Sequence, residues 1–253
     1  MNWTCKRSFG QKHPFLLTFL ALSLFLQAGS LCKEDAVESI RRLYGKNNIH
    51  PISSYEALMI SHVEGSLRRA LLKESKLNDV NFDFCPIYAH HLLNNLCTLV
   101  SASYLQIGLI AGENFISALY GNIPLLVEKR GVSLSRGDIE KEIFRRRCSL
   151  YLGNGRYQIE FPEQEKSLLN DSFDICFYDV SQLSPKFLKQ NFLYLNSASA
   201  PVFTLVIDDW NWDPVRKEAF DVFDEFNYKI LFEDEIPSIS GLGNGMYIAV
   251  VKK

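Results

Sequence analysis

Three carboxylates follow two apolar segments in the second half of the chain. Asp179 comes after the run Asp174–Tyr178, and the pair Asp208 and Asp209 comes after the run Val202–Ile207. If the two runs are neighbouring parallel strands, their carboxyl ends meet at one edge of a sheet. Oxygens there suit a hard cation such as Mg²⁺, which can hold and acidify a substrate hydroxyl. The sequence thus predicts a metal site at these aspartates. The alternative is that Asp208 caps the following helix and Asp179 is a turn residue.

A second candidate is the segment 104–112, which reads as a strand, a turn through Gly108 and Gly112, and the start of a helix. Glycine permits such a turn and leaves the backbone accessible, and free N–H groups at a helix start attract a carboxylate or phosphate. Glu128 follows at the spacing of an acid that binds ribose hydroxyls at a strand end. Ile110 stands where a dinucleotide motif needs its second glycine, which disfavours a nicotinamide cofactor. A nucleoside-type cofactor is therefore expected; the alternatives are a ligand-free turn and a solvated glutamate.

Aromatic and histidine side chains give weaker signals. Trp210 and Trp212 share one loop, and two indoles there either line a pocket or pack beneath it. His62, His90 and His91 lie in predicted helices without the spacing of metal ligands or of a catalytic base. We expect structural or surface roles for these histidines.

A doubly wound sheet would position the candidate residues. After Ser101, short apolar runs alternate with helical segments, which is typical of a parallel sheet covered on both faces. A Gly-rich loop joins the runs 228–232 and 246–251 without room for a crossover helix, so these strands should pair antiparallel. Apolar spacing predicts earlier helices over 54–73 and 86–100. The expected fold class is α/β: a Rossmann-like doubly wound seven-stranded sheet with an antiparallel C-terminal strand and an N-terminal helical extension. The other predicted strands are 104–109, 124–128, 157–161, 174–178 and 202–207, and the other predicted helices are 113–120, 139–150, 184–195 and 215–226.

Composition restricts the partners. A hydrophobic content of 47% with 22% charged residues is typical of a globular chain rather than a disordered one. A formal charge of -2 gives no overall attraction to nucleic acid, and Arg145–Arg147 reads as a solvated helix face. The six cysteines show no C-x-x-C pair, so we expect no disulfide framework.

The N-terminus reads as a leader. Basic residues precede the apolar run 15–26, and small residues follow it at 28–30, which is the pattern of a signal peptide. The run is shorter than the roughly 20 residues that span a bilayer, although extending the apolar segment through Leu31 makes an uncleaved membrane anchor arguable. We expect residues 1–30 to be a signal peptide or membrane anchor and 31–100 a helical extension. The protein would then be secreted or held at the cell envelope, with membrane association through the apolar segment.

The chain resembles class I S-adenosylmethionine-dependent methyltransferases, whose first motif reads Y-L-E-I-G-x-x-x-G. The segments that carry the resemblance, in order, are 91–97, 104–112, 118–122, 173–179, 206–212 and 245–252. The Asp-Asp-Trp element at 208–210 is the most specific of them, and residues 101–253 correspond to the catalytic domain. The residues implied to bind S-adenosylmethionine are Gln106, Gly108, Gly112, Glu128 and Asp179. The resemblance also implies Mg²⁺ at Asp179, Asp208 and Asp209, with Asp179 and Asp208 catalytic.

Two positions depart from the family pattern. Gln106 replaces an acid, which removes a charge expected near the methionine ammonium group. The sequence after Asp179 lacks the family's histidine, which could serve as a base. The expected function is methyl transfer to a hydroxyl of a small molecule or sugar, with no nucleic-acid partner. The alternative is a catalytically inactive binding protein that keeps the fold.

Overall fold

The structure is a computed structural model that describes residues 53–83, 87–108, 112–132, 138–153, 155–160, 172–179, 185–236 and 245–253. Residues Tyr55–Lys253 form one compact unit. The predicted leader, residues 1–30, lies outside the described residues. In the part of the chain that is described, no helix is long and apolar enough to cross a membrane.

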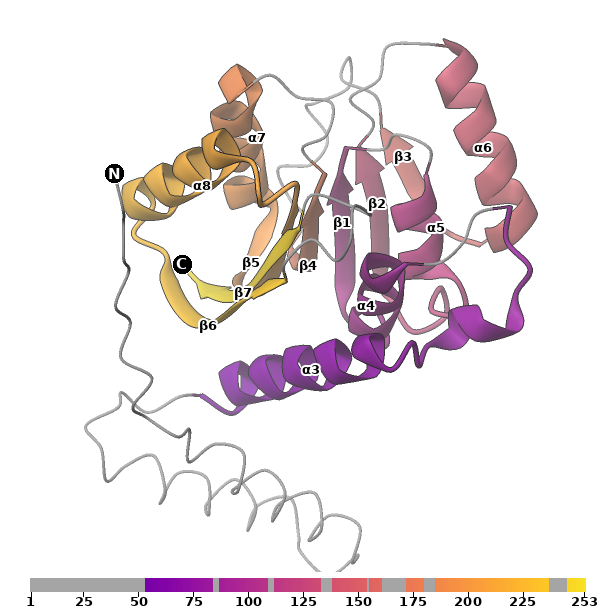
Figure 1. Cartoon of the computed structure of the whole chain (residues 1–253), viewed down its shortest axis with the longest axis horizontal. Coiled ribbons are helices and arrows are strands. Elements are labelled where there is room, and N and C mark those ends of the chain that lie inside the picture. The colour runs from indigo at the N-terminus through magenta and orange to yellow at the C-terminus, as the bar shows by residue number, and fades with distance from the viewer. Residues whose placement is uncertain are drawn as a thin grey trace, which may run out of the picture. The chain divides into compact units, whose positions relative to one another are not determined.

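The described strands form one seven-stranded sheet in the order β3-β2-β1-β4-β5-β7-β6 (Figure 1). Strands β1 to β5 pair in parallel, and β7 pairs antiparallel with β5 and with β6. The predicted fold class is confirmed, including the antiparallel end of the sheet. The strands are β1 (Ser103–Ile107), β2 (Glu128–Val132), β3 (Gln158–Glu160), β4 (Phe173–Tyr178), β5 (Ser199–Asp208), β6 (Lys229–Ile236) and β7 (Met246–Lys252).

Helices cover both faces of the sheet, because successive side chains of each buried strand point to opposite sides. On β1, Tyr104 joins the hydrophobic core formed with α3 to α6, whereas Leu105 joins the core formed with α7 and α8. The described helices are α3 (Ser54–Leu71), the short 3-10 helix η2 (Lys76–Asp79), α4 (Tyr88–Leu96), α5 (Glu113–Leu119), α6 (Asp138–Leu152), α7 (Pro185–Ala198) and α8 (Asp213–Glu225).

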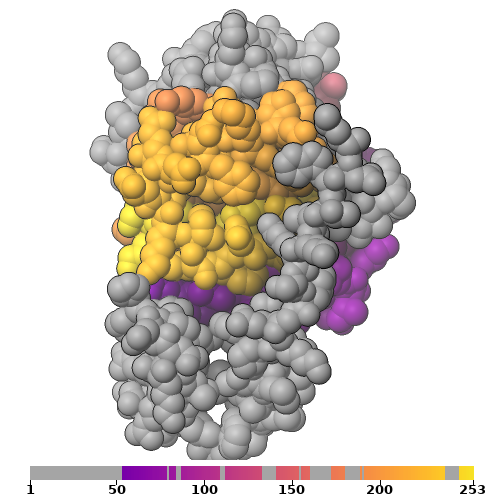
Figure 2. Space-filling view, turned by 60° about the vertical axis from the view of Figure 1, so that its left-hand side comes forward, coloured from indigo at the N-terminus to yellow at the C-terminus, as the bar shows by residue number. Residues whose placement is uncertain are grey.

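Helix α3 lies along the amino edge of the parallel strands (Figure 1). The Tyr55 hydroxyl donates to Asp174, near the start of β4, at 2.7 Å. Lys252, at the end of the antiparallel β7, forms an ion pair with the buried Glu56 at 2.8 Å. Figure 2 shows α8 and the β6–β7 side of the sheet above the indigo surface of α3. The helical extension is thus anchored at the edge of the sheet opposite Gly108, Asp179 and Asp208.

Strand β2 begins at Glu128, where the sequence predicted that a strand would end, so the predicted range 124–128 is wrong. The strand is hard to recognise because it buries Lys129 and Arg130, which are 7% and 5% exposed. The Lys129 ammonium donates to two carbonyls of the preceding turn, and the Arg130 guanidinium lies over the Phe173 ring. The carbonyls compensate for the burial of the Lys129 charge, and the ring gives the Arg130 guanidinium a favourable contact, although both residue types normally mark a solvated segment.

Candidate functional site

The carboxyl edge between β1 and β4 is the point where the order of the sheet reverses. From β1 the chain continues outward to β2 and β3, and then returns to place β4 on the other side of β1. Such a reversal leaves a crevice in which doubly wound folds bind ligands. Gly108 follows β1 and Asp179 follows β4, and the Asp179 N–H donates to the Ile107 carbonyl at 2.9 Å. Two predicted site residues therefore lie side by side at this reversal.

The two glycines of the predicted cofactor loop are needed for packing as well as for the turn. Gly108 has φ +89°, and a Cβ there would lie 2.4 Å from the Asp179 carbonyl oxygen. Gly112 has φ +80°, and a Cβ there would lie 2.3 Å from the Phe144 ring on α6. Both dihedral angles belong to the left-handed region that favours glycine. In the structure, glycine is needed at both positions because other parts of the chain approach closely. The sequence had suggested a different reason, namely access of a ligand to the backbone.

Gln106 lies beneath the Gly108 turn and is 1% exposed. The side-chain oxygen of Gln106 (Oε1) accepts a hydrogen bond from the Tyr104 hydroxyl at 2.9 Å. Its side-chain amide nitrogen (Nε2) donates to the Gly108 backbone carbonyl at 2.9 Å. Both ends of the side chain are therefore bonded within the protein. Its predicted contact with a cofactor stays a prediction, whereas its contact with the turn is a feature of the fold.

The structure brings the predicted aspartates together at the carboxyl edge. Burial raises the pKa of Asp208 to about 7, and the nearby charges of Asp179 and Asp209 act in the same direction. The Asp209 N–H donates to the Asp208 carboxylate at 2.9 Å, which opposes that rise. Asp208 is thus close to half protonated at neutral pH, and its ionised form can accept a proton.

The aspartates do not form a set of metal ligands in this structure. Within the described residues, which include all three, no group of three or more histidine, cysteine, aspartate or glutamate side chains is arranged to hold a metal ion. Magnesium at Asp179, Asp208 and Asp209 stays a prediction of the resemblance.

Asn114 is a residue at this site that the sequence did not point to. Its amide donates to the Asp179 carboxylate at 3.5 Å, so the first turn of α5 contacts the end of β4. The sequence signal was its place two residues after Gly112, but which residue would meet it depended on the order of the strands.

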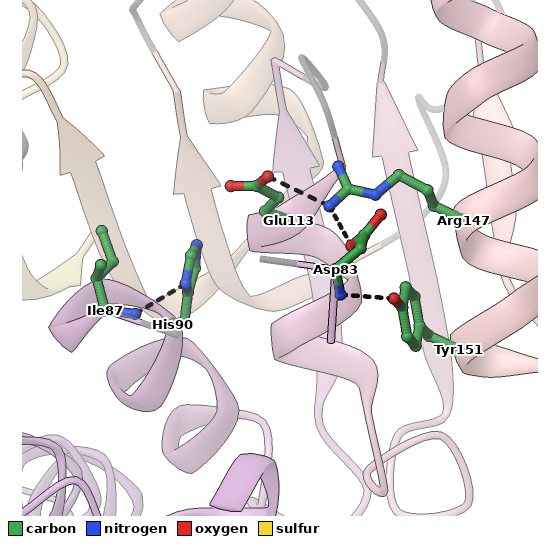
Figure 3. Close-up of polar contacts among 6 residues, drawn as sticks. All are labelled: Asp83, Ile87, His90, Glu113, Arg147 and Tyr151. Atoms are coloured by element: carbon green, nitrogen blue, oxygen red, sulfur yellow. Dashed lines mark hydrogen bonds and ion pairs between the residues drawn. The ribbon is translucent and has the colours of Figure 1, made fainter. Parts of the chain in front are cut away.

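Arg147 does not belong to the solvated helix face that the sequence predicted for Arg145–Arg147. Its neighbour Arg146 is solvated as expected, with 78% of its side chain exposed, but the Arg147 side chain is only 13% exposed. The Arg147 guanidinium reaches from α6 to the Asp83 carboxylate at 2.7 Å and the Glu113 carboxylate at 3.2 Å (Figure 3). Tyr151 accepts the Asp83 N–H at 2.8 Å. These contacts connect the segment before α4, helix α6 and the start of α5 beside the Gly112 turn.

His90 has the structural role that the sequence analysis expected. The Ile87 N–H donates to its Nδ1 atom at 3.1 Å and so caps α4 (Figure 3). Burial lowers the pKa of His90 to about 4, and the nearby His91 and Arg147 contribute. The imidazole is therefore neutral at physiological pH.

The two tryptophans of the Asp-Asp-Trp loop differ in environment. Trp210 is 1% exposed and stacks on Tyr247, with ring centroids 4.3 Å apart. Trp212 is 43% exposed and immediately precedes α8. Trp210 therefore packs beneath the loop, which is one of the two roles that the sequence left open.

Glu128 lies at the opposite edge of the sheet from the Gly108 turn. It pairs in register with Ser103, the first residue of β1, and its carboxylate lies 3.9 Å from the Arg130 guanidinium. The geometric reason for expecting it to bind ribose, its place at a strand's carboxyl end, is wrong. The carboxyl end of β2 is Val132, and the residues just after it lie outside the described residues.

No protein-family model and no curated protein matches the chain. Among solved structures, the chain is similar to the O-methyltransferase from Bacillus cereus in complex with SAH, at 16% identity and a TM-score of 0.51, over 85% of this chain and all of that chain. It is also similar to the cofactor-bound Rv0187 from MTB, at 14% identity and a TM-score of 0.53, over 77% of this chain and 90% of that chain. At these identities the likeness is one of fold. The chain therefore has the Rossmann-like fold of these proteins.

Proposed function

We propose that the chain is an S-adenosylmethionine-dependent methyltransferase that acts on a hydroxyl of a small molecule or sugar. The observation that carries the proposal is the junction of Gly108 and Asp179 at the reversal of the sheet, with the Asp208 carboxyl beside it. The shared fold with an O-methyltransferase supports the same function.

The acidic character of this edge fits the cofactor. Asp179, Asp208 and Asp209 lie close enough to perturb the pKa of Asp208, and their negative charge complements a cationic sulfonium. Gly108 and Asp179 would hold the cofactor, which supplies an electrophilic methyl group when it is bound. Asp208, with a pKa of about 7, would accept the proton of the acceptor hydroxyl.

Titration calorimetry on the full chain tests cofactor binding, with S-adenosylmethionine added in the presence of Mg²⁺ and, separately, of EDTA. Formation of S-adenosylhomocysteine with a panel of sugars and other hydroxyl compounds then tests turnover. Absence of binding under both conditions would overturn the proposal. Binding without turnover on any acceptor would favour the inactive binding protein.

A matched pair of variants tests the role of Asp208. Asp208→Asn removes the proton acceptor and should lower turnover by at least about 100-fold while cofactor binding persists. Asp221→Asn removes an exposed carboxylate of α8, which pairs with Lys217, and should leave turnover unchanged. Equal turnover in the two variants would exclude Asp208 as the base.

A further inference from the structure

A chain of two hydrogen bonds runs beneath the Gly108 turn. The Tyr104 hydroxyl donates to the Gln106 side-chain oxygen, and the Gln106 amide donates to the Gly108 carbonyl, each at 2.9 Å. Residues 104, 106 and 108 alternate along the chain and so share one side of the strand. Tyr104 and Gln106 are 0% and 1% exposed, so water does not compete for these bonds.

The direction of both bonds is determined by their ends. Burial raises the pKa of Tyr104 well above its ordinary value, so its hydroxyl stays a donor. The Gly108 carbonyl can only accept. The side chain at position 106 must therefore accept at one end and donate at the other. An amide does both, whereas an ionised carboxylate can only accept and would face the Gly108 carbonyl oxygen without a proton between them.

The carbonyl held by Gln106 belongs to Gly108, the residue directly after β1. Gly108 has φ +89° and has no room for a Cβ against Asp179, so its conformation is tightly constrained. Rotation of its carbonyl away from Gln106 would leave the buried Gln106 amide without its acceptor, which is costly.

We propose that Gln106 is a positioning residue that fixes the Gly108 carbonyl and hence the conformation of Gly108, so that an acid at this position weakens cofactor binding in this chain. The proposal rests on the proposed function, because it takes Gly108 to lie at the cofactor site. The family motif leads to the opposite expectation, because there Gln106 removes a negative charge expected near the methionine ammonium group of the cofactor. Here the amide is the matching partner of Tyr104 and Gly108.

The test is Gln106→Glu in the full chain, with dissociation constants for S-adenosylmethionine measured by calorimetry at pH 8 and at pH 5.5. At pH 8 we expect about tenfold weaker binding than in the wild type, which corresponds to about 1.4 kcal/mol. Burial raises the pKa of an introduced carboxyl, and its protonated form can donate to Gly108 as the amide does. The deficit relative to the wild type should therefore shrink at pH 5.5.

Two further variants separate this effect from general damage. Gln106→Met cannot bond at either end, so its deficit should be the same at both pH values. Tyr104→Phe removes the first bond without adding charge and should weaken binding about threefold. The titratable groups that influence Tyr104 are the Cys97 and Cys176 thiols, whose pKa values burial raises, and Asp179. Since Asp208 also titrates near pH 7, each variant is compared with the wild type at the same pH.

The outcomes are distinct. If the wild type does not bind the cofactor, the proposed function fails. If the wild type binds and Gln106→Glu binds equally or more tightly at pH 8, this inference is overturned and the proposed function stands. A deficit of Gln106→Glu that is equal at both pH values would also overturn it. Should Gln106→Glu not fold, as judged by circular dichroism, Tyr104→Phe decides, and unchanged binding there overturns the inference.

Discussion

Replacing Asp208 by asparagine should make the folded protein more stable at alkaline pH. Asp208 is a largely desolvated, partly buried carboxyl beside Asp179 and Asp209, and its pKa is raised from about 3.8 to about 7. An amide of similar shape removes the charge that burial and the two neighbours disfavour. Loss of a carboxylate is thus expected to stabilise this protein, in contrast to the loss of an ion-paired one.

The magnitude follows from proton linkage. Between pH 4 and pH 7 Asp208 is ionised in the unfolded chain but protonated in the folded one, so the folded state binds one more proton. The free energy of unfolding then falls by about 1.4 kcal/mol for each pH unit of increase, and levels off above the folded pKa. Over about three units this amounts to roughly 4 kcal/mol, an upper value because the side chain is not fully buried. Below about pH 4 Asp208 is protonated in both the folded and the unfolded chain, so the wild type no longer loses stability from its ionisation.

Urea unfolding of the two proteins at pH 5, 6, 7 and 8, without ligand and in EDTA, measures the effect. Asp208→Asn should exceed the wild type by about 2 to 4 kcal/mol at pH 8, and the gap should narrow steadily toward pH 5. Repetition in Mg²⁺ adds a second comparison, because a metal bound at this carboxylate would favour its ionised form and reverse the advantage of the variant.

A difference in unfolding free energy between the two proteins that does not change with pH would refute this prediction, since it would then not come from proton binding. The prediction would equally be refuted if Asp208→Asn were less stable than the wild type at pH 8 in EDTA. Asp179→Asn is a second test variant. It removes the neighbouring charge that raises the pKa of Asp208 most, and should therefore lower that pKa.

Three further predictions concern stability, each measured by urea unfolding. Gly112→Ala should cost about 2 to 4 kcal/mol from backbone strain and overlap with the Phe144 ring, and combination with Phe144→Ala should be less than additive. Arg147→Met should cost about 1 to 2 kcal/mol by leaving two carboxylates without their shared cation, whereas Arg146→Met should stay within about 0.5 kcal/mol; equal losses would contradict the difference in burial. Tyr55→Phe should cost about 1 kcal/mol by releasing α3 from β4, and an unchanged midpoint would show that this bond contributes nothing.

The sequence predicted the elements whose apolar side chains mark them directly. The runs around β1, β4, β5 and β7 stood out because every strand there is largely buried. Strand β2 was not recognised because it buries Lys129, which donates to carbonyls of the preceding turn, and Arg130, which lies over the Phe173 ring. A buried charge that the fold compensates looks the same in sequence as a charge in water.

The candidate site shows the same limit. Sequence patterns identified Gly108 and the aspartates, because residues at strand ends can be read from the strands themselves. Which strand ends are neighbours depends on the order of the sheet, and so the contact of Asp179 with Gly108 and with Asn114 could not be read in advance. The sequence could not show that Gln106 accepts from Tyr104 and donates to Gly108, because this depends on the direction of the Gly108 carbonyl.

The place of β7 has a consequence for how the protein is made. Residues 246–252 come after every other described element along the chain, yet they form an interior strand between β5 and β6. While a chain emerges from the ribosome, β5 keeps an open edge and β6 has no partner until these residues appear. The sheet therefore cannot be completed until residues 246–252 have emerged, and until then its open strand edges are exposed to pairing with other chains.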